Sequence, residues 1–137
     1  MKKIIEQMKK MNKLALTNGD IPVSCVIIKD NTIIASGYNR RVKDNDPLQH
    51  AEIIAIKRAS KKLKTYNLKD CELYTTLKPC RMCEEVIKES RIKNVHYILD
   101  KKKDVNNKIS YHQISDDYNY FLDEIQGFFR DKRYNIV

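Results

Sequence analysis

The sequence contains no long hydrophobic run. No stretch of 18 apolar residues occurs in its 137 residues, so we expect no membrane-spanning helix. The N-terminal stretch MKKIIEQMKKMNK does not have the uninterrupted apolar core of a secretory signal either, because its apolar residues recur at helical spacing between charges. These absences predict a cytoplasmic protein that does not associate with membranes.

The sequence also lacks repeats, linkers and low-complexity segments. A chain of this length without such features predicts a single domain over residues 1–137. No run of basic residues is long enough to form a basic arm, although the net charge is +9. This charge favours a polyanionic partner such as nucleic acid, but an excess of lysine from AT-biased codon usage would also produce it.

Cysteines are few, and their spacing is uneven. Four occur, and in a cytoplasmic protein they favour metal-binding or core positions over disulfides. Cys25 lies within an apolar segment and Cys71 begins another, so we expect both to be core residues. Cys80 and Cys83 form a C-x-x-C pair behind Pro79, which is the pattern of a metal site or a redox pair.

The hydrophobic periodicity predicts an α/β domain in which helices cover a sheet. A weak pattern at 109–114 indicates a possible fifth strand, and we expect polar loops at 39–49 and 100–110. The expected helices are 2–17, 50–64, 80–90 and 116–131, and the expected strands are 21–30, 32–38, 71–77 and 94–99.

Two short motifs predict one zinc site. Pro79 suits the first turn of a helix, so Cys80 and Cys83 would lie at a helix N-terminus, which stabilises thiolates. With His50 as a third donor, one zinc ion per chain would keep one open coordination position, as catalytic zinc sites do. Glu52 follows His50 by two residues and would lie near that position as a proton shuttle.

Two other interpretations of these residues remain open. The C-x-x-C pair could be a redox pair, which usually accompanies a thioredoxin-like βαβ pattern. Alternatively, Cys25 or Cys71 could supply a fourth ligand, and the zinc would then be structural.

The combination H-x-E…P-C-x-x-C resembles the signature of the zinc-dependent nucleobase deaminases. Within that superfamily the chain most resembles the bacterial tRNA adenosine deaminases. IPVSCVII is similar to their VPVGAVLV, GYNRRVKDNDPLQHAEIIAIKRA to their GWNRPIxxxDPTAHAEIxALRxA, and FFRDKR to their FFRxRR. This resemblance implies a three-layer α/β/α cytidine-deaminase-like fold with a central mixed sheet of about five strands.

The resemblance also implies an activity and roles for individual residues. The activity is conversion of the wobble adenosine of a tRNA anticodon to inosine, by attack of a water that zinc activates, in a homodimer that binds the anticodon stem-loop. His50, Cys80 and Cys83 match the zinc ligands, and Glu52 matches the general acid/base. The implied substrate contacts are Asn39 at the flipped base, Pro22 and Val23 lining its pocket, Asp100 or Lys101 near a ribose, and Phe128, Phe129 and Arg130 in the last helix.

Some positions depart from this family pattern. Lys78 stands where the family has a glutamate before the proline, and residues 99–110 lack the usual glycines. One alternative is therefore a small-molecule deaminase, such as a guanine deaminase. Another is a non-catalytic zinc-stabilised RNA-binding module.

Overall fold

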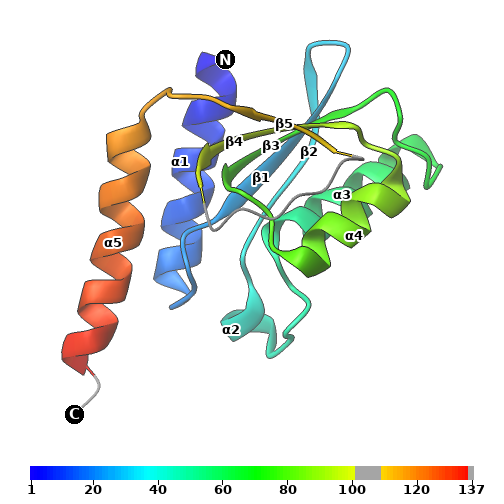
Figure 1. Cartoon of the computed structure of the whole chain (residues 1–137). Helices are drawn as coiled ribbons and strands as arrows, with labels where there is room; N and C mark the ends of the chain where they lie inside the picture. The colour runs from blue at the N-terminus through cyan, green and yellow to red at the C-terminus, as the bar shows by residue number, and fades with distance from the viewer. Residues whose placement is uncertain (101–108, 136–137) are drawn as a thin grey trace.

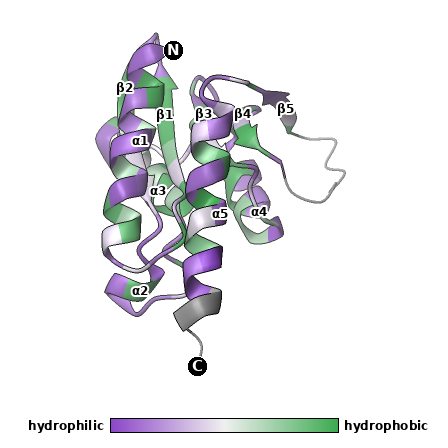
Figure 2. Ribbon diagram, turned by 90° about the vertical axis from the view of Figure 1, so that its left-hand side faces the viewer, coloured by the Kyte–Doolittle hydropathy of each residue, from purple (hydrophilic) through white to green (hydrophobic). Residues whose placement is uncertain are grey.

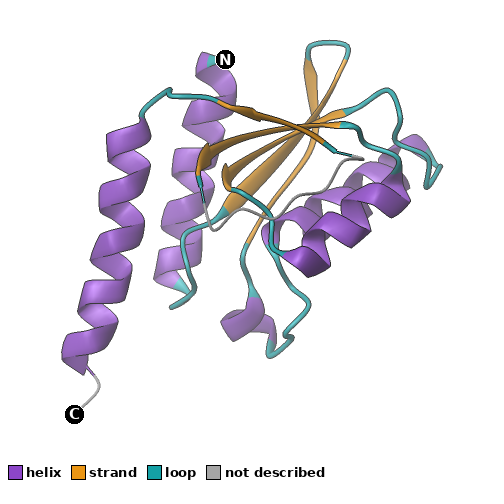
Figure 3. Ribbon diagram, in the orientation of Figure 1, coloured by secondary structure: helices purple, strands orange, loops and turns teal. Residues whose placement is uncertain are grey.

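The computed structural model describes residues 1–100 and 109–135, which form five helices and five strands. The segment that contains Lys101 lies outside the described residues. Figure 3 shows the elements by type. Their bounds are α1 Lys2–Thr17, β1 Ser24–Lys29, β2 Thr32–Tyr38, α2 Arg41–Asp44, α3 Ala51–Leu63, β3 Glu72–Leu77, α4 Arg81–Ser90, β4 Asn94–Leu99, β5 Ser110–Gln113 and α5 Tyr118–Asn135.

The five strands form one mixed sheet in the order β2-β1-β3-β4-β5. β1 pairs antiparallel with both β2 and β3, whereas β3, β4 and β5 run parallel. The parallel pair β3 and β4 is joined through α4, as such a connection requires. The predicted fold class and the mixed sheet of about five strands are confirmed.

Helices cover both faces of the sheet. α1 and α5 lie on one face, and α3 and α4 lie on the other (Figure 1). The central strand β1 contributes to both interiors: Cys25 and Ile27 pack in the cluster that contains α3, and Val26 and Ile28 pack in the cluster that contains α1. Burial on both faces explains why this strand appears in the sequence as a continuous apolar run rather than an alternating one.

The outer layer of α1 and α5 is amphipathic. In Figure 2 the two helices lie side by side, and each contains both hydrophilic and hydrophobic residues along its length. Met8 of α1 and Phe121 of α5 are fully buried against the sheet. Within the part of the chain that the structure describes, no helix is both long and apolar enough to span a membrane.

Two elements differ from the expected pattern. The stretch 39–49, predicted to be a loop, contains the short helix α2, whose Val42 N–H donates to Asp20 Oδ2 at 3.0 Å. A four-residue helix fixed by a distant carboxylate leaves no periodic signal in a sequence. The last helix runs from Tyr118 to Asn135 instead of 116–131.

Candidate metal and catalytic site

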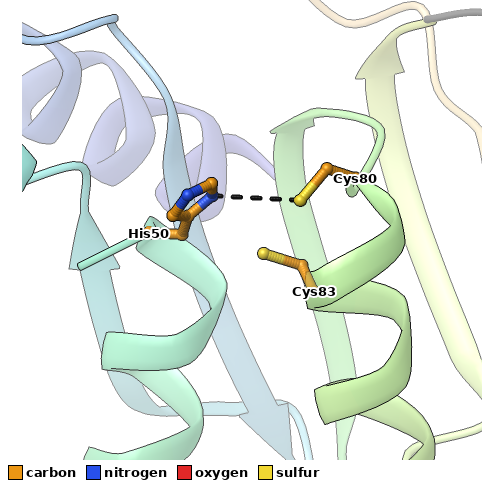
Figure 4. Close-up of side chains that lie close together, drawn as sticks. All are labelled: His50, Cys80 and Cys83. Carbon is orange, nitrogen blue, oxygen red and sulfur yellow. Dashed lines mark hydrogen bonds between the residues drawn. The ribbon is translucent and has the colours of Figure 1, made fainter. Parts of the chain in front are cut away.

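The two predicted motifs meet at the N-termini of two helices. His50 is the N-cap residue of α3 and Cys80 is the N-cap residue of α4, while Cys83 lies in the first turn of α4. Figure 4 shows the three side chains pointing toward one another. One donor atom from each residue lies within 4.8 Å of the others, and His50 Nδ1 is 4.0 Å from Cys80 Sγ.

The two sulfurs have opposite pKa shifts. Hydrogen bonds from the Cys83 thiol and from His50 lower the pKa of Cys80 to about 3. The same bond to Cys80, together with burial, raises the pKa of Cys83. Cys80 is therefore the sulfur that loses its proton more readily, and a bound metal would favour the thiolate form of both cysteines.

The donor set fits zinc with an open position. Two sulfurs and one imidazole nitrogen are donors that zinc prefers. Among residues 1–100 and 109–135, no further histidine, cysteine, aspartate or glutamate joins this cluster. Cys25 and Cys71 are instead buried in the hydrophobic core around α3, so neither supplies a fourth ligand. The donor set therefore favours a catalytic zinc site over a structural one.

Glu52 lies beside the metal-binding side chains in the first turn of α3. Its side chain is buried, with 4% of the residue exposed. Burial raises the pKa of the carboxyl group, and a hydrogen bond with Cys83 opposes this effect. A raised pKa makes the ionised carboxylate a stronger base, which suits a group that accepts and then releases a proton.

His50, Glu52 and Cys80 line one cavity of about 90 Å³. The predicted pocket residues Asn39 and Val23 line it, whereas Pro22 is buried next to it and is not part of the lining. The full lining is Ile21, Val23, Asn39, Arg41, His50, Glu52, Leu77, Lys78 and Cys80.

Asn39 is held rigidly at this cavity. Its Oδ1 accepts from the Ala51 N–H at 3.0 Å, and its Nδ2 donates to the Ile21 carbonyl at 3.2 Å. The side chain thus supports the first turn of α3, whereas the family resemblance implied a contact with the substrate base. An amide nitrogen has two donor hydrogens, so one remains for a ligand in the cavity.

The remaining predicted contacts lie outside the cavity lining. Asp100 is exposed, and its Oδ1 lies 3.9 Å from Lys78 Nζ. Phe128 lines a separate groove between α1 and α5, and its ring lies 5.3 Å from that of Phe129, which is 46% exposed. Arg130 is exposed on α5. The roles of these residues in binding RNA stay predictions.

Sequence reasoning missed two cationic residues of the cavity. Arg41 comes from α2, whose formation the sequence does not reveal, and Lys78 stands out in the sequence only as a departure from the family pattern. The one signal for Lys78 is its place directly before Pro79 and Cys80.

Residues 1–99 match the family model described as the cytidine and deoxycytidylate deaminase zinc-binding region. The chain belongs to this family, and zinc is the metal that its donor set and its family have in common. The resemblance found in the motifs is thereby confirmed.

Relatives within the family have different substrates. The tRNA-specific adenosine deaminase of Aquifex aeolicus is 44% identical over 91 residues, which are 66% of this chain and 60% of that protein. The guanine deaminase of Bacillus subtilis is 49% identical over 79 residues, covering 58% and 51% of the two chains. The matched region thus spans 51–60% of the length of these curated relatives.

A solved structure shares the fold over most of the chain. It comes from studies of A-to-I editing by tRNA:A34 deaminases at the wobble position of transfer RNA. It superposes with a TM-score of 0.74 at 25% identity, covering 80% of this chain and 95% of the other.

Proposed function

We propose that the chain is a zinc-dependent hydrolytic deaminase that converts the wobble adenosine of a tRNA anticodon to inosine. One observation carries the proposal: His50, Cys80 and Cys83 converge on one point, and two of them, His50 and Cys80, line the same cavity as the buried Glu52. The similarity to tRNA-specific adenosine deaminases supports the choice of substrate.

The cavity residues provide the proton transfers of such a reaction. Zinc, when bound, acidifies a water molecule so that it can act as a nucleophile at neutral pH. Glu52 takes one proton from the attacking water and passes it to the purine ring nitrogen next to the reacting carbon. It then takes the second proton from the hydroxyl group now on that carbon and delivers it to the departing amine, so that the carbon–nitrogen bond breaks and a carbonyl group forms. Water is consumed and ammonia is released, so the atoms balance. A shuttle of this kind contributes about 10²–10⁴-fold in rate.

Other residues orient the base. The free amide hydrogen of Asn39 can donate to the purine, and Val23 and Leu77 give the cavity apolar walls. A duplex or a stacked loop hides the reacting carbon, so the adenosine would have to leave the stack to enter.

We further propose that tRNA is the macromolecular partner, that the protein acts in the cytoplasm, and that two chains form a homodimer. The net charge of +9 supports a polyanionic partner.

A guanine deaminase activity is the second candidate, supported by the 49% identity to the Bacillus subtilis enzyme. The two candidates differ in the size of the substrate. A non-catalytic zinc module is disfavoured because the donor set leaves a position open beside Glu52.

The test is incubation of the zinc-loaded protein with an arginine tRNA transcript that has adenosine at the first anticodon position, with inosine detected by sequencing. Parallel reactions contain guanine, cytosine or dCMP. We expect inosine in the tRNA, and no inosine with a Glu52→Ala variant that retains zinc. Turnover of a free base without inosine formation would favour the second candidate, and no turnover of any substrate would contradict both.

A further inference from the structure

Two basic residues line the catalytic cavity from opposite parts of the chain. Arg41 belongs to α2, and Lys78 lies between the end of β3 and the start of α4. The proposed reaction makes no use of either charge, since a purine base is neutral. Their presence requires a separate explanation.

Lys78 is largely removed from solvent, because its side chain is only 13% exposed. Its Nζ lies 4.7 Å from the ring centroid of Tyr111 and 5.3 Å from that of Tyr97. Such cation–π contacts fix the ammonium group without neutralising it. The carboxylate of Asp100 is 3.9 Å away and 44% exposed, a distance too long for a hydrogen bond.

Arg41 is held by an ion pair with a buried carboxylate. Its Nε lies 3.5 Å from Asp20 Oδ1, and the Asp20 side chain is fully buried. Asp20 also accepts hydrogen bonds from the backbone N–H groups of Ile21 and Val42, at 2.9 and 3.0 Å. The buried Arg41 Nε has no hydrogen-bond partner among the described residues. Arg41 is therefore held by a rigid anchor, but its hydrogen-bonding capacity is not fully used.

The two cations of the lining are paired to different degrees. Arg41 lies beside the buried carboxylate of Asp20, whereas among the described residues Lys78 is within 4 Å only of the half-exposed carboxylate of Asp100, beyond hydrogen-bond distance. Partly desolvated cations with incomplete pairing attract an anion. A free nucleobase offers none, whereas a nucleotide has a phosphate a few bonds from its base.

We infer that Lys78, assisted by Arg41, binds a phosphate group attached to the target nucleoside, so that the pocket selects a nucleotide over a free base. This inference rests on the proposed deaminase function and specifies its substrate class. The phosphate could belong to an RNA loop or to a mononucleotide, and the test distinguishes these sources.

The test measures binding without turnover, using zinc-loaded protein with Glu52→Ala as the parent. The ligands are an anticodon stem-loop, AMP and adenosine, and the Kd for each is measured over a range of salt concentrations. Lys78→Gln is compared with Lys78→Arg, which keeps the charge, and with Lys61→Gln, which removes an equal charge from the exposed last turn of α3. Zinc content and melting temperature establish that each variant is folded.

We expect Lys78→Gln to weaken stem-loop binding about 10-fold or more, as removal of a charge-assisted hydrogen bond does. The association constant for the stem-loop decreases with salt concentration. In a plot of its logarithm against the logarithm of salt concentration, the slope should become less steep by about 0.7 for each single-strand phosphate that the variant no longer contacts. Lys78→Arg and Lys61→Gln should stay close to the parent, and adenosine binding should not change.

The outcomes separate the inference from the proposed function. If AMP competes better than adenosine in a Lys78-dependent way and the stem-loop does not bind, the phosphate site stands and the tRNA substrate is wrong. If only the stem-loop depends on Lys78, the phosphate belongs to RNA. If a folded, zinc-replete Lys78→Gln binds every ligand like the parent, with an unchanged salt slope, the inference is overturned.

Discussion

At the scale of single residues, Glu52 decides whether the site can transfer protons. Glu52→Gln keeps the size of the side chain but cannot accept a proton, so we expect kcat to fall about 10²–10⁴-fold. Zinc content should stay the same, because Glu52 is not one of the three converging donors. Steady-state kinetics and metal analysis of the same preparation check this. A variant that loses zinc as well would mean that Glu52 is a ligand.

Glu124 on α5 gives a residue-scale prediction about pH. Burial raises the pKa of its carboxyl group, and the hydrogen bond that it accepts from Asn12 Nδ2 at 2.8 Å opposes the rise. Since the folded protein binds the proton more tightly than the unfolded chain, this group favours folding below its ordinary pKa of 4.5. That contribution is lost as the pH rises through the raised pKa.

We therefore expect Glu124→Gln to gain stability relative to the wild type as the pH rises from about 4 to 7. The glutamine can still accept the hydrogen bond from Asn12, so the comparison isolates the ionisation. Urea denaturation of both proteins at each pH gives the difference in unfolding free energy. A difference that is flat or falls with pH would contradict the prediction.

At the scale of elements, the close contact between β2 and α3 determines where His50 and Glu52 lie. A Cβ at Gly37 would lie 2.8 Å from the Ala51 carbonyl oxygen and 2.9 Å from Ile54 Cγ2. Gly37→Ala should therefore push α3 outward, destabilise the fold by about 1–3 kcal/mol and reduce zinc occupancy. Chemical denaturation and metal analysis measure both effects.

Gly127 in α5 is the matched control. The nearest atom to a Cβ there is Arg130 Nη2 at 3.6 Å, an ordinary van der Waals distance. Gly127→Ala should stabilise the protein by about 0.5–1 kcal/mol, because alanine favours a helix more than glycine does. Equal effects of the two substitutions would contradict the close packing of α3 on β2.

The elements also explain what the sequence could and could not predict. The turn at Asp30 and Asn31 was predictable from its residue types, and both residues have positive φ, of 52° and 60°. β5 was only weakly indicated, because its four residues are SYHQ and none is fully buried. The three candidate metal ligands all lie in two short motifs at the starts of α3 and α4. Their convergence was therefore predictable from local sequence patterns.

Lys78 and Arg41 are positioned at the cavity by tertiary contacts, which hydrophobic periodicity in the sequence does not reveal. Arg41 depends on the anchor at Asp20, 21 residues earlier in the chain. Lys78 depends on the tyrosines of β4 and β5, which only the parallel pairing of those strands brings together. Local patterns thus predict the donors, while tertiary contacts determine the charge around them.

At the scale of the whole molecule, the metal should link the two helices that carry its ligands. His50 and Cys80 are 30 residues apart in the sequence and are the N-cap residues of α3 and α4. Zinc at 100 times its Kd would stabilise the native state by about 2.7 kcal/mol. We expect a chelator to lower the melting temperature by roughly 10 °C. Added zinc should restore it, whereas an unchanged melting temperature would mean that these residues do not hold the metal in the native state.

The most direct test of the account is X-ray absorption at the zinc edge of the purified, zinc-replete protein. His50, Cys80 and Cys83 as the only protein ligands predict two sulfur scatterers at about 2.3 Å and two nitrogen or oxygen scatterers at about 2.0–2.1 Å, one of them exchangeable with solvent. Three or four sulfurs, or a first shell without an exchangeable oxygen, would contradict a site open for chemistry.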